Sequence, residues 1–409
     1  MSCIDLAPNP TVPARARCLS PGAAFYLQAS ITVSFLAGSS APTPLYALYQ
    51  ARWHFSPTMV TVIFGVYALA VLAALLVAGR LSDHVGRRPV LLGAIVVQVA
   101  AMLLFAQAHG VAELLVARVV QGISVGAAAG AVGAGLLDLD RTRGTLANAV
   151  ATPLGTATGA MLSAVLVQSL PYPMHLVYLV LAAVFVAQGF GVLRMAETHM
   201  PRPGALASLK PQLTLSAAVR GPMLIAVPAL VAAWALAGFY ASLGPALVRG
   251  IVGTSSTLLG ALSLFVLASS AALATLALRD QSPRALTWIG TITLVSGVAT
   301  AMAALTLRSA PLFFLGTALS GAGFGAGFQG AIRSLAAEAA PHERAGVLSV
   351  AFIVSYLAMG LPAIVAGYLV TRHGDIVGTA REFGVMVIAL ALLSLTASIA
   401  KQRRPSVSR

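Results

Sequence analysis

Long uncharged stretches alternate with short clusters of charge along this chain. The uncharged runs are 18–51, 53–79, 89–112, 119–137, 144–193, 221–248, 250–278, 285–307, 309–332, 345–371 and 383–400. An α-helix needs about 20 residues to cross about 30 Å of hydrocarbon. The run 144–193 is long enough for two crossings, and SLPYPMH at 169–175 interrupts it. The pattern therefore predicts twelve membrane-spanning helices, over 23–46, 57–79, 89–108, 112–137, 146–169, 174–193, 222–247, 255–278, 285–307, 311–332, 346–370 and 383–400.

Composition supports a membrane protein and excludes several other classes. The chain is 58% hydrophobic and 9% charged, whereas soluble domains are about 45–50% apolar and about 25% charged. The formal net charge of +14 is spread singly between apolar runs rather than clustered, so we expect the lipid bilayer and no nucleic acid as partner. The only two cysteines lie in the N-terminal tail and the seven histidines are dispersed. We therefore expect no metal and no cofactor.

The basic residues predict the orientation of the helices. Of the 25 basic residues, 19 lie on the side of the two termini and five on the opposite side. By the positive-inside rule both ends are cytoplasmic. The tail before the first span lacks a continuous apolar segment, so we expect no cleaved signal peptide. Only Lys210 and Lys401 are lysines, and this arginine bias suggests a bacterium, whose inner membrane would hold the chain.

An internal repeat divides the chain. Shifted by about 197 residues, SDHVGRRPVLLG (82–93) aligns with RDQSPRALTWIG (279–290), and the glycines of span four align with those of span ten. Parallel repeats around a central cavity are one known plan for transporters. We predict an N-terminal tail (1–22), a six-helix bundle (23–193), a cytoplasmic linker (194–220), a second six-helix bundle (221–400) and a C-terminal tail (401–409), acting as a monomer.

Two motifs resemble those of the major facilitator superfamily. G-x-L-S-D-x-x-G-R-R lies between spans two and three, and R-x-x-Q-G-x-x-x-G lies in span four. The resemblance covers the whole chain and implies two pseudo-symmetric bundles of six helices, a small-molecule substrate, alternating access and no enzymatic activity. Glu197-Thr198 after span six also resembles a short motif of efflux members. No Walker loop, catalytic triad or paired buried carboxylate is present, which argues against an enzyme or an ATP-driven pump.

Arg118 is the most informative single residue, because a charge inside the hydrocarbon costs at least about 2.5–3.5 kcal/mol. We expect it to act in proton or substrate coupling, as the resemblance implies. The alternative is an arginine that snorkels to the nearby boundary. Gln121 lies one turn further on the same helix face. Glu113 either pairs with Arg118 or is solvated, and both alternatives stay open at this point.

The loop motif predicts a conformational latch. Its proposed members are Gly79, Asp83, Gly86, Arg87, Arg88, Asp138 and Asp140. We expect Arg87 to reach Asp138 or Asp140, and by resemblance Asp83 to bond the start of span eleven. The alternative is that the arginines only set the topology. No acidic residue lies near the middle of a predicted span, so Glu113 and Asp138 are the remaining candidates for proton coupling.

Small residues predict close helix packing, and aromatic residues suggest a substrate cavity. The packing positions are Gly122, Gly126, Gly155, Gly159, Gly360 and Pro362. In span five the antiporter pattern G-x-x-x-G-P-x-x-G-G becomes Gly155-Thr-Ala-Thr-Gly159-Ala160-Met-Leu-Ser163-Ala164, which lacks the proline. The candidate cavity residues are Ser39, Ser40, Trp234, Phe239, Tyr240, Phe324, Phe328, Gln329 and Tyr356. Any one of these aromatic residues could instead serve packing alone.

The leading hypothesis is a secondary transporter that exports small amphipathic or apolar organic molecules and uses the proton gradient. A proton-linked importer or facilitator of a metabolite is the alternative, because the span-five pattern is altered. A receptor or assembly protein on the same scaffold is a remote third. Retention of both motifs favours transport over this third hypothesis.

Overall fold

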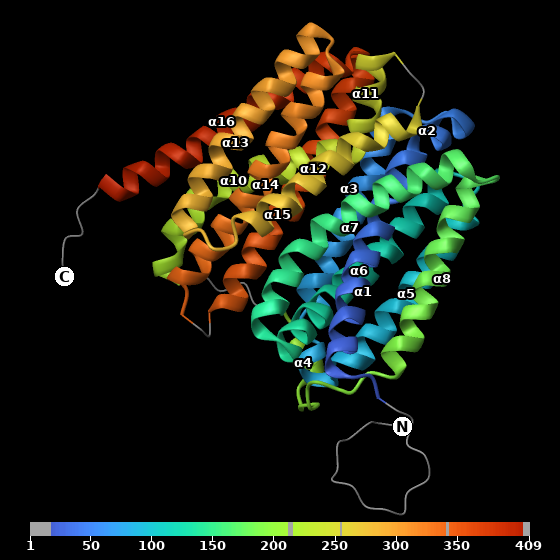
Figure 1. The fold of residues 1–409 in the computed structure, drawn as a ribbon, viewed down its shortest axis with the longest axis vertical. Helices are drawn as coiled ribbons and strands as arrows, with labels where there is room; N and C mark the ends of the chain where they lie inside the picture. The colour runs from blue at the N-terminus through green and yellow to red at the C-terminus, as the bar shows by residue number, and fades with distance from the viewer. Residues whose placement is uncertain (1–17, 212–215, 254–255, 341–342, 404–409) are drawn as a thin grey trace, which may run out of the picture.

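The computed structural model describes residues 18–211, 216–253, 256–340 and 343–403, and all regular secondary structure in these ranges is helical (Figure 1). The first half contains α1 (Pro21–Ser40), α2 (Pro42–Trp53), α3 (Pro57–Ala78), α4 (Ser82–Val85), α5 (Arg87–Ala106), α6 (Val111–Leu139), α7 (Arg141–Ser169) and α8 (Pro173–Leu193). The second half contains α9 (Ala205–Ser208), α10 (Ala217–Ser242), α11 (Gly244–Val252), α12 (Thr257–Ala277), α13 (Pro283–Leu307), α14 (Ala310–Glu338), α15 (Arg344–His373) and α16 (Ile376–Arg403).

The predicted all-α membrane fold of twelve spans in two six-helix bundles is confirmed. Eleven helices of the described part are long and apolar enough to cross a membrane. The first predicted span is not among these eleven, and it is divided into α1 and α2 at Ala41. The seventh span is divided in the same way at Leu243, between α10 and α11. In both spans a proline follows the division within two residues, and proline has no backbone N–H to continue a helix.

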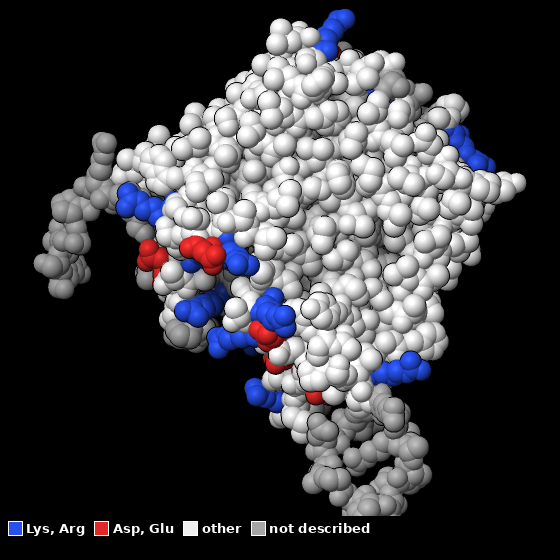
Figure 2. Space-filling model, in the orientation of Figure 1, with Lys and Arg blue, Asp and Glu red and all other residues white. Residues whose placement is uncertain are grey.

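Two ends of the bundle are distinguished below. The end that carries α2, α11 and the turn between α15 and α16 lies away from both chain termini (Figure 1), and we call it the distal end. The opposite end carries α4 and the start of α5, and we call it the proximal end. The charged side chains visible in Figure 2 gather mainly toward the proximal end.

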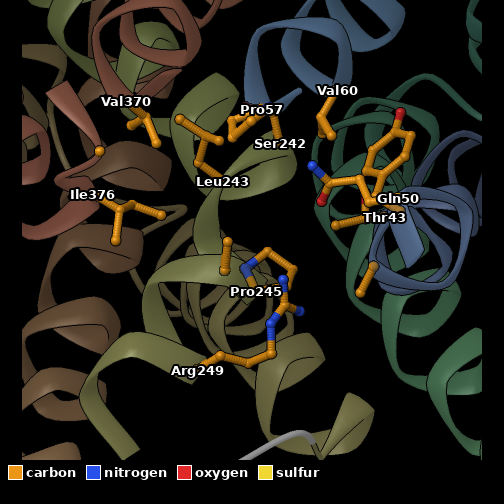
Figure 3. Close-up of a pocket in the computed structure, with 14 residues that line it drawn as sticks. Thr43, Gln50, Pro57, Val60, Ser242, Leu243, Pro245, Arg249, Val370 and Ile376 are labelled. Atoms are coloured by element: carbon orange, nitrogen blue, oxygen red, sulfur yellow. The ribbon is translucent and has the colours of Figure 1, made fainter. Parts of the chain in front are cut away.

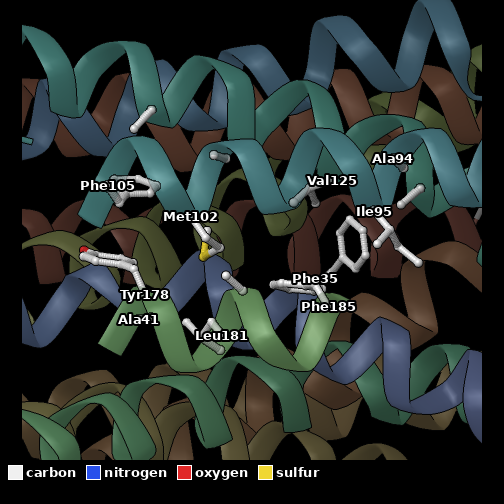
Figure 4. Packing of buried hydrophobic residues seen from close by; sticks show 14 of the residues in the cluster. Phe35, Ala41, Ala94, Ile95, Met102, Phe105, Val125, Tyr178, Leu181 and Phe185 are labelled. Carbon is white, nitrogen blue, oxygen red and sulfur yellow. The ribbon is translucent and has the colours of Figure 1, made fainter. Parts of the chain in front are cut away.

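The core of the first bundle is aromatic and aliphatic. Phe105 of α5 stacks on Tyr178 of α8 with ring centroids 4.8 Å apart, and Phe35 of α1 meets Phe185 of α8 edge-on at 5.2 Å (Figure 4). All four side chains are almost completely buried. The second bundle has its own buried clusters, built from α10 to α16 with Ala160 of α7 as a contact from the first bundle. Each half therefore has its own apolar interior.

Equivalent glycines pack equivalent helices in the two halves. A Cβ atom on Gly126 of α6 would lie 2.5 Å from the carbonyl oxygen of Val71 on α3. A Cβ atom on Gly325 of α14 would meet the carbonyl oxygen of Ala271 on α12 in the same way. Gly122 and Gly321 make matching contacts one turn earlier. The repeat found in the sequence thus has a packing counterpart, since small residues let helix backbones approach closely.

The other predicted packing positions behave differently from one another. Gly155 and Gly159 of α7 lie against the backbone of α1, so they hold the first bundle together. A Cβ atom on Gly360 of α15 would have its nearest neighbours, on α3, at about 3.5 Å, which is ordinary contact across the two halves. Pro362 lies inside α15.

The two halves are joined by hydrogen bonds near the distal end. Thr43 of α2 donates to the carbonyl oxygen of Ala241 at 2.9 Å. At the start of α3, the Thr58 hydroxyl bonds that of Thr371 at 2.8 Å and the carbonyl oxygen of Gly367 at 3.2 Å. These threonines join α2 and α3 of the first bundle to α10 and α15 of the second. Along the interface α3 packs on α15 and α7 packs on α12.

The predicted domain boundaries stay a prediction. The linker predicted over 194–220 contains α9, non-helical segments and the first residues of α10, and residues 212–215 within it lie outside the described part. Most of the predicted N-terminal tail and the last six residues of the predicted C-terminal tail also lie outside it.

Candidate functional site

Arg118 is the largest completely buried side chain of the described residues, at 0% exposure. Helix α6 carries it into the interior of the first bundle, facing the bend between α1 and α2. One terminal nitrogen, Nη1, donates to the carbonyl oxygen of Ser39 at 2.9 Å and to Gln121 Oε1 at 2.7 Å. The other, Nη2, donates to the hydroxyl of Tyr46 at 2.6 Å. The snorkelling alternative is therefore not what the structure shows.

Aromatic faces complete the surroundings of this guanidinium. Its central carbon lies 5.1 Å from the ring centre of Tyr67, 5.6 Å from that of Phe105 and 5.8 Å from that of Tyr46. Ring faces attract cations electrostatically. The Nε–H group has no acceptor, and no carboxylate pairs with Arg118 anywhere in the described part of the chain. Neutral dipoles and ring faces alone thus stabilise this buried charge.

Glu113 does not take part in this arrangement. Its side chain is exposed, and it accepts a hydrogen bond from the backbone N–H of His109 just before α6. A carboxylate at a helix N-terminus is stabilised there by the helix dipole. Of the two alternatives left open by the sequence, the structure shows the solvated one.

Ser39 and Ser40 support the arginine site instead of lining a cavity. Each hydroxyl donates to a carbonyl oxygen of its own helix, Ser39 to Phe35 at 2.8 Å. Ser39 also accepts from the hydroxyl of Tyr67 at 2.8 Å. Both serines are buried. The expectation that they face a substrate is corrected, because their polar atoms are used within the bundle.

A second cluster, formed by aromatic residues, lies where the two halves meet. Trp234 of α10 contacts Phe324 and Phe328 of α14 and Tyr356 of α15, with ring centroids 5.4 to 5.6 Å apart. Tyr356 also packs against the core of the first bundle. All four side chains are half-buried. These four predicted cavity residues are thus brought together by three helices.

Unpaired polar atoms accompany this aromatic cluster. The indole N–H of Trp234, Oε1 of Gln329 and the hydroxyl of Ser355 are buried without a hydrogen-bond partner. Buried polar groups usually have partners, because leaving one unpaired costs about 1–3 kcal/mol. Such atoms can hydrogen-bond a guest molecule.

Phe239 and Tyr240 do not belong to this cluster. Phe239 packs on Phe383 with ring centroids 4.8 Å apart, and Tyr240 stacks on Phe313 at 6.1 Å. The hydroxyl of Tyr240 bonds that of Thr317 at 3.0 Å. Both residues lie in the core of the second bundle, so their prediction as cavity residues is corrected. Their sequence position gave the depth in the membrane, while the helix face was decided by neighbouring helices.

At the proximal end, the loop motif forms a charged network. Arg87 is 7% exposed and its Nε donates to Asp138 Oδ2 at 3.2 Å. Its Nη1 donates to the hydroxyl of Ser82 at 2.8 Å and forms an ion pair with Asp83. Asp140 instead caps α7 by accepting from the backbone N–H of Arg143 at 2.9 Å. Of the two partners expected for Arg87, the structure places Asp138 beside it.

Glu197 is a member of this network that the sequence reasoning noted only as a weak motif. Its carboxylate accepts from the backbone N–H of Arg87 at 2.8 Å and of Arg88 at 3.1 Å, at the N-terminus of α5. Gly86 has φ of +106°, and a Cβ atom there would lie 2.7 Å from the Glu197 carboxylate. Only glycine fits this backbone and this space. Gly79 is close enough to α6 that a Cβ atom on Gly130 would meet its carbonyl oxygen.

Asp83 does not contact the start of α15 in this structure. Its carboxylate bonds Arg87 within the first bundle, and the side chain of Arg88 donates to the carbonyl oxygen of Leu193. The expected bond between Asp83 and span eleven is therefore not formed here.

Two matching bundles of six membrane helices, with a buried charge in one and aromatic side chains at their junction, define a two-bundle membrane transporter. The family model "Major Facilitator Superfamily" matches residues 29–363. The chain belongs to the Major Facilitator Superfamily, a family of transporters and not of enzymes.

Known relatives agree with this family. Over 71 residues the chain is 42% identical to "Multidrug resistance protein MdtL" of Klebsiella pneumoniae (strain 342), which covers 17% of this chain and 18% of the relative. The chain thus matches less than a fifth of the length of this relative. A bacterial homologue of the human lysosomal transporter Spinster, solved in an inward-facing and occupied conformation, has a TM-score of 0.73 at 13% identity, covering 94% of this chain and 98% of that one. The nucleoside transporter NupG has a TM-score of 0.66 at 12% identity, covering 93% and 98%.

Proposed function

We propose that this protein exports small amphipathic organic molecules by alternating access, in a bacterial inner membrane with both termini in the cytoplasm. The observation that carries the proposal is Arg118, a charge buried in a membrane bundle with no carboxylate partner. Such a residue is costly to insert and usually marks a transport pathway. The aromatic cluster around Trp234 supplies an apolar surface, and its unpaired polar atoms supply neutral hydrogen-bonding groups.

The hydrogen bonds between the bundles suggest how access alternates. Thr43 and Thr58 join the two halves near the distal end. We therefore take this structure as the conformation in which the distal side is closed. Opening that side requires breaking these bonds while the halves rock along the α3–α15 and α7–α12 interfaces.

The network around Arg87 is the proposed latch for the opposite conformation. Here Arg87 holds Asp83 inside the first bundle. When the proximal ends close, Asp83 would come within reach of the positive end of α15 and exchange partners. The same network also serves topology, because its arginines lie on the side predicted to be cytoplasmic.

Energy coupling to protons is proposed through the two ends of α6. Glu113 lies at its distal end and Asp138 at its proximal end, with Arg118 between them on the same helix. Protonation of Asp138 would weaken its ion pair with Arg87 and so loosen the latch. The MdtL match is consistent with export, although it covers only a short segment.

Transport into and out of proteoliposomes tests this proposal. Purified protein in vesicles with an imposed pH gradient should move a panel of aromatic compounds against their concentration gradient, and Arg118→Leu protein should not. The proposal fails if no compound accumulates with the gradient in either direction.

A metabolite importer is the second candidate. It is favoured by Ala160, which stands where antiporters of the family tend to carry proline and is fully buried against residues of the second bundle. Counterflow measured in inside-out and in right-side-out vesicles separates the two functions. An exporter takes up its substrate at the proximal side, which is the proposed cytoplasmic side, whereas an importer takes it up at the distal side.

A further inference from the structure

A cavity at the distal end lies between the two bundles and has a pronounced electrostatic character. Its volume is about 290 Å³, and α2, α3, α11 and the α15–α16 turn contribute to its walls (Figure 3). Val60, Leu243, Val370 and Ile376 provide apolar wall, and Gln50 and Arg249 provide polar groups from opposite bundles.

Arg249 supplies a positive charge to this cavity. It lies on α11, is half-buried, and its guanidinium extends into the cavity toward Pro245 (Figure 3). Within the described part of the chain, no ion pair or hydrogen bond of its side chain is found. The acidic residue nearest in sequence to the lining, Asp375, already accepts from the backbone N–H of Gly378 at 2.8 Å. No aspartate or glutamate lines the cavity.

Tyr46 links the cavity to the buried charge of the first bundle. It lines the cavity, and its hydroxyl accepts from Arg118 Nη2 at 2.6 Å. The proton of that hydroxyl has no acceptor among the described residues, so it remains available as a donor. Arg249 of one bundle and the Arg118–Tyr46 pair of the other thus both favour an acceptor between them.

The acidic residues supply no carboxylate to the lining itself, and the carboxylate of Asp375, between the lining residues Gly374 and Ile376, accepts from the backbone N–H of Gly378. The ten acids of the described part lie in loops or at helix ends, namely Asp83, Glu113, Asp138, Asp140, Glu197, Asp280, Glu338, Glu343, Asp375 and Glu382. A cationic guest would be repelled by Arg249 and would meet no carboxylate in the lining. An anionic guest would be attracted by Arg249, and charge-assisted hydrogen bonds are the strongest kind.

We propose that this cavity binds the carboxylate or sulfonate of an amphipathic organic anion, so that the transported substrates are organic anions. Arg249 would bind the charged group, Tyr46 and Gln50 would donate to it, and the apolar wall would cover the aromatic or aliphatic body. The inference that the transported substrates are organic anions rests on the transport function proposed above. The inference that the cavity binds an anion does not depend on that function.

Binding to the purified full-length protein in phosphatidylcholine nanodiscs tests the site. The probes share a naphthalene body and differ in the charge of one small group: 2-naphthoate, neutral 2-naphthalenemethanol and cationic 2-naphthylmethylammonium. By calorimetry, naphthoate should bind at least about tenfold more tightly than the cation, since two unpaired positive charges favour one and oppose the other. Equal or tighter binding of the cation overturns the proposal.

Substitutions locate the binding. Arg249→Gln should weaken naphthoate binding at least about tenfold, while Arg249→Lys should keep most of it because the charge remains. Arg308→Gln is the matched control, since it removes an exposed charge at the same end of the molecule. Equal effects of R249Q and R308Q overturn the proposal. Melting temperatures without ligand show whether each variant is folded. If Arg249→Gln is not folded, the naphthoate affinity of Arg249→Lys is the test, and a loss of binding in that variant while it remains folded overturns the proposal.

Two further arms separate the explanations. If phosphatidylglycerol in the nanodiscs abolishes naphthoate binding, the cavity holds a lipid headgroup and the proposal is overturned. If naphthoate binds as expected but no vesicle transports any compound, the site stands and the transport function fails. If vesicles export the neutral or cationic probe and naphthoate does not bind, transport stands and the anion site fails.

Discussion

The two bundles share their packing but not their charge. Gly122 and Gly126 of α6 have their counterparts in Gly321 and Gly325 of α14, and both pairs bring two helix backbones together. One turn earlier, Arg118 and Gln121 correspond to Thr317 and Ser320. Thr317 merely bonds a tyrosine and its own helix. The repeat therefore preserves the scaffold, whereas the buried charge belongs to the first bundle alone.

The proximal loops differ in the same direction. In the first half Arg87 is buried and holds Asp83 and Asp138 together. In the second half the aligned aspartate, Asp280, pairs only with its exposed neighbour Arg279 at 3.3 Å, and Arg284 is exposed. Exposed ion pairs contribute about 0–1 kcal/mol. Helix packing is therefore similar in the two halves of the chain, whereas the charged network at the proximal loop is present only in the first half.

The largest effect is expected from removing the buried charge. Arg118→Leu should reduce the initial rate of transport by roughly 100-fold, because about 3 kcal/mol of charge-assisted bonding is lost from the site. Thr317→Val, at the equivalent position, should leave the rate within about twofold and lower stability by about 1 kcal/mol. Vesicle uptake normalised to the amount of folded protein checks both. Full activity of R118L protein would remove Arg118 from the mechanism.

A large loss of stability is expected from filling either glycine contact. Gly126→Leu and Gly325→Leu should each destabilise the protein by at least about 1–3 kcal/mol, since the new side chain overlaps a backbone carbonyl of the facing helix. Gly93→Leu is the control, because a Cβ atom there has nothing within 4 Å. Melting temperatures in detergent measure the three. A loss confined to one bundle would show that the packing is not equivalent.

A moderate effect is expected at the proximal network. Arg87→Gln should lower turnover about fivefold, because the ion pairs of Arg87 with the partly exposed carboxylates of Asp83 and Asp138, worth about 1 kcal/mol, are lost. Arg284→Gln removes the aligned, exposed arginine and should change turnover little. Equal slowing by both variants would mean that the arginines only set the orientation of the helices in the membrane. A protease-accessibility assay would then detect inverted protein.

The smallest effect is expected at the distal contacts between the bundles. Thr371→Val removes the hydroxyl that bonds Thr58, so the distal-closed conformation should lose about 0.5 kcal/mol, or about twofold in population. Distance measurements between spin labels at the distal ends of α2 and α11 report this shift. Thr379→Val is a control, because that hydroxyl bonds only its own helix. If the distance distribution shifts no more for Thr371→Val than for Thr379→Val, the hydrogen bonds of Thr58 do not keep the distal side closed.

The sequence alone determined the number of spans, most of their limits, the repeat and the family. These features follow from the length of uncharged runs and from local motifs, both of which act over neighbouring residues. The divisions at Ala41 and Leu243 did not show in the hydrophobic pattern, because both segments of each span are apolar. Prolines mark them, but a proline does not by itself say whether a membrane helix continues.

Only the tertiary structure decided which side chains meet. The partners of Arg118 come from α1, α2, α3 and α5, and nothing local to residue 118 could name Tyr46, Tyr67 or Phe105. The same holds for Phe239 and Tyr240, which the packing of α10 against its neighbours places in the core of the second bundle instead of a cavity. The sequence set the depth of each residue in the membrane, because rise along a helix is constant. The face it presents depends on how the neighbouring helices pack.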